Sequence, residues 1–269
     1  MTGHSLGAAP PAEVASHAAG LSTGLSEADR RTLADVGYVV LPDLVDPASL
    51  AAMRATFDDA WADGESGITE RLRLLGYPAF REFIDQESLQ GVPRSIFGGH
   101  LQLLDCWLTY QPAASRWRTR KYTAGTERDW HRDFTFVGAD PGRPLIVNML
   151  LFLQDSEQTG PTVVLPGSHR QRAAVMSEHS TDPHPDEVEV ALRAGDVLLF
   201  NSHLVHSRGR NLSRAPRRAV AMMWGYWFIK PVDMHLPLCP GALEGASEDR
   251  LRLLGVEPPT VDLYLFESF

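Results

Sequence analysis

The chain has 269 residues, of which 43% are hydrophobic and 22% charged, a composition ordinary for a soluble globular protein. Its formal net charge of −9 argues against a general nucleic-acid binder, because phosphate contacts need a basic face. Two cysteines, Cys106 and Cys239, are too few for a disulfide framework and too far apart for a zinc knuckle. We find no secretory signal and no apolar run that could span a membrane, so we expect a cytoplasmic protein without membrane contact.

The first elements are predicted to be helical. Residues 1–24 lack hydrophobic periodicity and are rich in small residues, which predicts a mobile N-terminal arm. Ser26 followed by Asp29 resembles a capping box, in which each side chain accepts a hydrogen bond from the other residue's free amide. Gly37 would end the helix that this box opens.

A strand and more helix follow. Residues 38–41 predict a short strand, and Asp46-Pro47 supplies an N-cap and a first-turn proline for a second helix. Apolar residues then recur at helical spacing and predict packing against a sheet rather than a cofactor pocket; they are Leu50, Met53, Phe57 and Trp61. Residues 68–92 indicate further helix.

From about Leu101 the chain consists of short β-like runs separated by Gly, Pro, Asp and Ser. The expected strands are 101–110, 130–137, 145–153, 162–165, 187–192, 196–200 and 219–229. Many short strands without interleaved helices favour an antiparallel sandwich or barrel. We therefore expect residues 25–269 to form one domain, mainly β with N-terminal helices, of the jelly-roll type.

Two His-x-Asp pairs are candidate metal-binding pairs. His131 and Asp133 are two residues apart, so on a strand both side chains point to the same face. Aromatic and β-branched neighbours suit a partly buried strand there, although a core histidine held by hydrogen bonds is the alternative. The second pair, His184 and Asp186, lies among prolines that oppose strand structure, so we interpret it as a surface loop.

A candidate for the third metal ligand lies further along the chain. Residues 195–200 predict a turn and a strand that lead to His203 and His206, either of which can complete a triad. Two histidines and one carboxylate leave three positions open on Fe(II), enough for a chelating oxo-acid and oxygen, whereas catalytic zinc usually keeps one open. Arg217 begins the next strand-like run, and its guanidinium could clamp a carboxylate. A basic surface turn that includes Arg218 is the alternative.

Four segments together resemble the phytanoyl-CoA dioxygenase family of Fe(II)/2-oxoglutarate oxygenases; they are residues 36–42, 130–133, 160–169 and 195–217. The resemblance implies a double-stranded β-helix of the cupin-like kind. It also implies iron(II) bound by His131, Asp133 and His206, with 2-oxoglutarate and O2 as cosubstrates. His206 is favoured over His203 because the family's distal histidine precedes the Ser/Gly and Asn pattern of residues 206–213.

The resemblance places Arg217 where the family binds the 2-oxoglutarate carboxylate, with Arg218 as a less favoured substitute. It implies a structural role for His169. Two positions, Arg208 and Met149, depart from the family pattern. Arg208 stands where a small residue is frequent. Met149 stands where many members have a tryptophan lining the cosubstrate pocket, so we expect Met149 to line it here.

The expected reaction is hydroxylation of an unactivated C–H bond of a small metabolite, as in natural-product biosynthesis, with release of succinate and CO2. Halogenating relatives replace the triad carboxylate with a small residue, so Asp133 favours hydroxylation or desaturation. Arginine-rich stretches, including residues 116–121, favour an anionic small-molecule substrate. The alternative is a jelly-roll zinc hydrolase or isomerase that uses the same three ligands.

Overall fold

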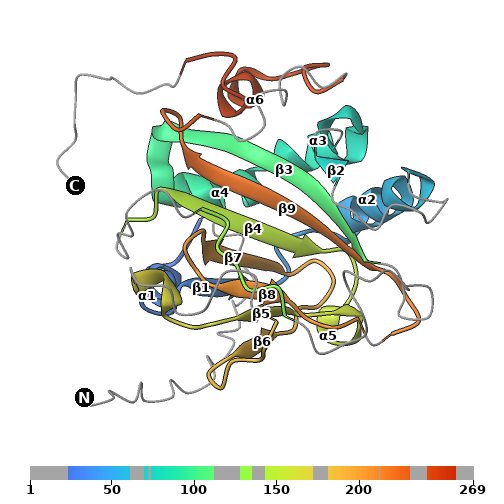
Figure 1. Cartoon of the computed structure of the whole chain (residues 1–269). Coiled ribbons are helices and arrows are strands. Elements are labelled where there is room, and N and C mark those ends of the chain that lie inside the picture. Colours follow the sequence, from blue (N-terminus) through green and yellow to red (C-terminus); the bar gives the residue numbers. More distant parts are fainter. Residues whose placement is uncertain are drawn as a thin grey trace.

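The structure is a computed structural model that describes residues 24–60, 70–71, 74–111, 128–134, 143–171, 181–211, 213–230 and 241–258. Helices come first and antiparallel strands follow, which confirms a mainly β protein with N-terminal helices (Figure 1). Apart from Gly24, the expected arm lies outside the described residues. None of the helices in the described ranges is long and apolar enough to cross a membrane.

The two N-terminal helices begin where the caps predict. Helix α1 spans Glu27–Val36; its capping box is complete, and Gly37 ends it in the left-handed conformation at φ 94°. Strand β1 follows at Tyr38–Leu41. Helix α2 spans Pro47–Ala60, and the Asp46 carboxylate accepts hydrogen bonds from the first free amides. Its apolar stripe is buried as expected, while Trp61 lies outside the described residues.

The region expected as continuing helix is more broken than the sequence indicates. It contains strand β2 (Glu70–Arg71), a 3-10 turn (Leu74–Gly76), helix α3 (Pro78–Ile84) and helix α4 (Glu87–Phe97). A second 3-10 turn, Gly98–His100, leads into the sheets. The two-residue strand was not predicted, because so short an element carries no periodicity.

Two antiparallel sheets form the β part. The larger has the order β1-β7-β4-β9-β3-β2, with β3 at Leu101–Gln111, β4 at Ile146–Phe152, β7 at Val197–Asn201 and β9 at Arg217–Tyr226. The smaller has the order β6-β5-β8, with β5 at Thr162–Val164, β6 at Val188–Val190 and β8 at His206–Arg208. Short helices α5 (Ser156–Thr159) and α6 (Glu248–Leu253) and a 3-10 turn (Ser168–Arg170) complete the described elements.

Most strands expected after Leu101 are confirmed, with two differences. The described part of the run predicted for residues 130–137 forms only an isolated bridge, at His131. Strand β8 was not predicted, and it contains His206. Both differences fall at the candidate metal ligands.

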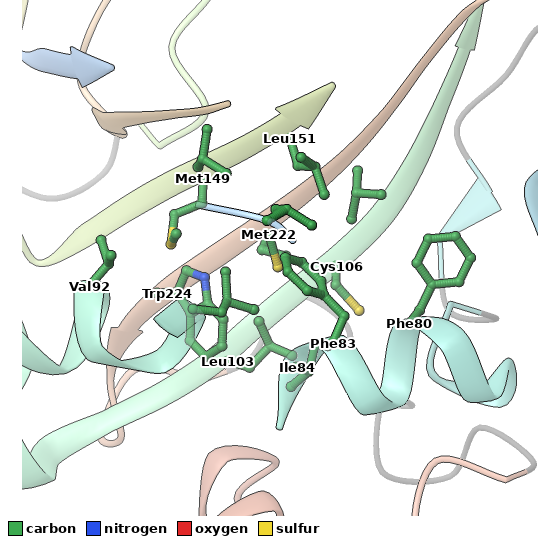
Figure 2. Packing of buried hydrophobic residues seen from close by; sticks show 14 of the residues in the cluster. Phe80, Phe83, Ile84, Val92, Leu103, Cys106, Met149, Leu151, Met222 and Trp224 are labelled. Carbon is green, nitrogen blue, oxygen red and sulfur yellow. The ribbon is translucent and has the colours of Figure 1, made fainter. Parts of the chain in front are cut away.

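The large sheet is covered on both faces. On one face α3 and α4 pack against β3, β4 and β9, and Figure 2 shows this contact between side chains that include Phe80, Phe83, Met149, Met222 and Trp224. A second cluster, between the two sheets, includes Leu150, Phe152, Leu198, Phe200, Val164 and Val190. Because successive side chains of a strand point to opposite faces, every second residue of β4 faces the smaller sheet.

Candidate metal centre and buried arginine

Three potential ligands converge between β8 and the segment before Phe134. His131, Asp133 and His206 each offer a ligand atom, and these atoms lie within 4.8 Å of one another. The Asp133 carboxylate is 3.5 Å from Nε2 of His131 and 3.6 Å from Nε2 of His206. The two histidines are direct partners in an antiparallel bridge, with both backbone hydrogen bonds at 3.0 Å. This pairing places both rings on the side of the carboxylate.

Backbone carbonyls fix which nitrogen of each ring faces the site. Nδ1 of His131 lies 2.7 Å from the Asp129 carbonyl, and Nδ1 of His206 lies 3.0 Å from the Leu204 carbonyl. A carbonyl can only accept, so each Nδ1 carries the proton and each Nε2 presents a lone pair. Metal-binding histidines have this arrangement, because the bond from the other nitrogen orients the ring. The donor set therefore fits a divalent metal.

Burial and the carboxylate act in opposite directions on the two rings. Burial lowers the pKa of His206, which favours the neutral form that binds metals. Burial also acts to lower the pKa of His131, but the hydrogen bond and charge of Asp133 outweigh it and raise that pKa. The carboxylate therefore attracts positive charge to the point at which the three side chains meet.

Asn148 of β4 orients the carboxylate ligand. Its Nδ2 donates a 2.7 Å hydrogen bond to Oδ2 of Asp133, and the residue is 2% exposed. Its Oδ1 has no hydrogen-bond partner in the described part of the chain, so a buried acceptor remains beside the triad. We did not predict this residue, although a polar side chain in the apolar run 145–153 was the signal for it.

The segment that carries His131 and Asp133 is held from outside the site. The indole of Trp130 donates to the Asp182 carbonyl at 2.8 Å, and Arg132 donates to the carbonyls of Ser168 and Gln171 at 3.1 Å each. Arg128 forms ion pairs with Glu187 and Glu189 of the neighbouring strand region. Side chains that point away from the triad thus fix the backbone of its ligands.

Arg217 is a buried cation at the start of β9. It is 2% exposed, donates from Nε to the Gly160 carbonyl at 2.9 Å, and donates from Nη1 to the Thr109 hydroxyl at 3.0 Å. Its guanidinium lies 4.7 Å from the centroid of the Phe152 ring. Burial, with a smaller effect of the Arg208 charge, lowers its pKa to about 9, so it stays protonated at neutral pH.

No ion pair joins Arg217 to an acidic residue of the described ranges. A buried charge that lacks an opposite charge is unfavourable, and an anionic ligand would relieve this. Arg218 differs, since it forms a 2.7 Å ion pair with Asp58 and is 24% exposed. Of the two arginines considered, Arg217 is thus the buried one without an acidic partner in the described ranges.

The placement of Met149 contradicts the prediction that it lines the cosubstrate pocket. Its side chain belongs to the cluster under α3 and α4, where Figure 2 shows it beside Met222 and Trp224. Its neighbours Asn148 and Leu150 face the smaller sheet instead. The expectation came from the position of Met149 in the family pattern, and because β4 is buried on both faces its hydrophobicity does not show which face this residue occupies.

Two other histidines, His169 and His184, lie as the sequence predicts. His169 is fully buried and donates from Nε2 to the Ala34 carbonyl at 3.0 Å, a structural contact. His184 lies in a loop and accepts a hydrogen bond from the amide of Asp186, apart from the triad. The basic stretch at residues 116–121 lies outside the described residues.

Comparison with known proteins identifies the family. The family model described as "Phytanoyl-CoA dioxygenase (PhyH)" matches residues 33–219, a range that contains the triad and Arg217. An ectoine dioxygenase of Halomonas elongata is 26% identical over 274 residues, covering 87% of this chain and 77% of the relative. Dioxygenase cdmA of Talaromyces verruculosus is 30% identical over 244 residues, covering 81% and 79%.

A solved structure shows the same fold. HygX from Streptomyces hygroscopicus, crystallised with nickel and 2-oxoglutarate, matches with a TM-score of 0.62 at 20% identity, covering 77% of this chain and 90% of HygX. The sequence and structural likenesses agree with each other and with the triad geometry. The chain belongs to the phytanoyl-CoA dioxygenase family.

Proposed function

We propose that this protein is an Fe(II)/2-oxoglutarate-dependent dioxygenase that hydroxylates an unactivated C–H bond of a small metabolite, releasing succinate and CO2. The observation that carries the proposal is the convergence of two Nε2 atoms and one carboxylate, with both histidine tautomers fixed by backbone carbonyls. Two histidines and a carboxylate are typical of iron sites that keep open positions for a chelating cosubstrate and oxygen.

In this proposal His131, Asp133 and His206 hold the iron, and Asn148 fixes the orientation of the carboxylate. Iron and 2-oxoglutarate, when bound, supply the oxidising chemistry, and the protein supplies binding and orientation. Asp133 occupies the ligand position that halogenating relatives leave open for chloride. A carboxylate there favours hydroxylation.

Arg217 and the Thr109 hydroxyl bind the distal carboxylate of 2-oxoglutarate in this scheme. They lie on the same face of the sheet as Asn148. Between Asn148 and Arg217 the paired residues on that face are apolar, Leu150 opposite Ala221 and Phe152 opposite Ala219. Apolar walls exclude water and strengthen the charge interaction at the arginine.

We also infer that the two sheets form a double-stranded β-helix, that residues 25–269 are one catalytic domain, and that the enzyme works in the cytoplasm. The sheet orders and the likeness to HygX support the fold. The relatives named for ectoine support a small-molecule substrate.

Anaerobic addition of Fe(II) and 2-oxoglutarate tests the proposal. We expect a weak visible charge-transfer band that disappears in His131→Ala and persists in His184→Ala, which alters the other His-x-Asp pair. A folded, iron-loaded protein without this band would contradict the proposal. The zinc hydrolase alternative predicts activity with zinc and without 2-oxoglutarate, so succinate formation that requires iron rules it out.

A further inference from the structure

An apolar cluster lies on the large sheet, mostly toward the end opposite to Arg217, and we call it the apolar rim. Its buried members are Leu104, Ile146 and Met223, and its partly buried members are Trp107, Phe134, Leu145 and Ile229. They come from β3, from β4 and the residue before it, from β9 and the turn after it, and from the residue that follows Asp133.

The rim borders the triad on two sides. Phe134 follows Asp133, and both amides donate to the Ser202 carbonyl, at 3.4 and 3.2 Å. The Ser202 amide in turn donates to the Ile146 carbonyl at 3.3 Å, which ties the ligand segment to the first residue of β4. On the other side, Met223 pairs with Asn148, the residue that binds the Asp133 carboxylate.

The direction of β9 separates the rim from the cosubstrate anchor. Arg217 is the first residue of the strand, and Met223 lies near its other end on the same face. A dicarboxylate held by Arg217 and the iron would lie along the first part of β9, and most of the rim lies toward the other end of that strand. In Figure 1 β9 runs the length of the large sheet between β3 and β4.

The outer part of the rim is apolar and partly exposed in the part of the chain that the structure describes. Trp107, Phe134, Leu145 and Ile229 are all partly exposed. Contiguous apolar surface of this kind marks a binding site, because leaving it in water is unfavourable. Asp105 pairs with Met223, and at 1% exposed its side chain lies beneath the exposed part of the rim.

Three described arginines near the site are engaged away from the rim. Arg217 faces the opposite end, Arg218 pairs with Asp58, and Arg132 donates to two backbone carbonyls. Two aromatic rings among branched aliphatic side chains suit flat, uncharged rings.

We propose that the apolar rim binds an uncharged, ring-containing part of the substrate. This contact would hold the C–H bond that reacts close to the metal ligands His131, Asp133 and His206. This inference rests on the proposed function, because it names the substrate class of the same site. A charged group placed against these apolar side chains would lose its hydration.

A binding assay that does not depend on catalysis tests the rim directly. The neutral dye Nile red should bind the wild-type protein, and Ile229→Asp should weaken binding about tenfold or more. Val256→Asp is the matched control, since Val256 is an exposed apolar side chain outside the rim. The anionic dye anilinonaphthalene sulfonate shows whether a negative charge adds affinity. Equal Nile red binding in wild type and Ile229→Asp would overturn the proposal.

A turnover assay then separates this inference from the proposed function. Succinate formation with iron and 2-oxoglutarate is measured with a neutral polycyclic ketone, a zwitterionic amino acid and a polycationic aminoglycoside. We expect only the neutral ring compound to raise turnover, and Ile229→Asp to reduce that rise about tenfold. A rise with only the charged compounds would overturn the rim proposal. Rim-dependent dye binding without succinate under any condition would support the rim and refute the proposed function.

Discussion

Replacing Arg217 by methionine tests the proposed binding of the 2-oxoglutarate carboxylate without changing a metal ligand. Burial, with a smaller effect of the Arg208 charge, lowers the pKa of Arg217 from its ordinary value to about 9. One pKa unit corresponds to about 1.4 kcal/mol, so burying the charged form is unfavourable by about 5 kcal/mol. Above pH 9, up to the ordinary pKa of an arginine, the unfolded chain binds a proton that the folded chain does not, so stability rises with pH there. Below pH 9 the whole penalty is present.

Two hydrogen bonds offset that penalty. Arg217 donates to the Gly160 carbonyl and the Thr109 hydroxyl, and hydrogen bonds from a charged donor contribute about 1.5–3 kcal/mol each. We therefore expect Arg217→Met to change the free energy of unfolding of the ligand-free protein by less than about 2 kcal/mol. Loss of one partner from a buried charge pair weakens binding by about 2–5 kcal/mol, so the Kd for 2-oxoglutarate should rise about 30-fold to several thousand-fold.

Anaerobic titration of the metal-loaded protein with 2-oxoglutarate measures the Kd, and thermal unfolding with and without the ligand measures stability. Ligand at a hundred times its Kd stabilises by about 2.7 kcal/mol, and a 30-fold weaker Kd reduces this to below about 1 kcal/mol. Arg218→Met is the matched control, since Arg218 pairs with Asp58 at the surface. An unchanged 2-oxoglutarate Kd in Arg217→Met would refute the assignment of the anchor.

Three further changes have expected outcomes. Asn148→Ala removes the hydrogen bond to Asp133 and should weaken iron affinity about 10- to 100-fold in competition with a chelator; unchanged affinity would show that Asn148 does not orient the ligand. Thr109→Val removes a neutral partner of Arg217 and should raise the 2-oxoglutarate Kd only about 3- to 10-fold, and a loss equal to that of Arg217→Met would be inconsistent with an auxiliary role. Burial lowers the pKa of His169 from 6.5, so the unfolded chain binds more protons and stability falls as the pH drops through 6.5. In His169→Gln the decrease in Tm below that pH should be smaller, and an identical pH profile would contradict this.

Local signals predicted local structure well. The capping box at Ser26 and the glycine at position 37 predicted both ends of α1, because caps are decided by neighbouring residues. The pairing of His131 and Asp133 could be preferred over His184 and Asp186 because the prolines around the second pair oppose strand structure.

Contacts between distant strands could not be predicted in the same way. Asn148 reaches Asp133, and Thr109 reaches Arg217, only because of the register between strands, which depends on the whole sheet. The family position suggested a pocket role for Met149, and the sequence could not show its face, since a strand buried on both faces gives no alternation to follow. Strand β8 is too short to show a period of two residues.

The antiparallel bridge between His131 and His206 has a consequence for folding as well as for chemistry. The two residues are far apart in the sequence, so a metal ion bound by both closes a long loop, as a disulfide would, but reversibly. Closing a loop in the native state favours the folded chain when the unfolded chain binds the metal weakly. A metal ion at this site would then stabilise the contact between the segment that carries His131 and β8, and removing the ion would weaken that contact.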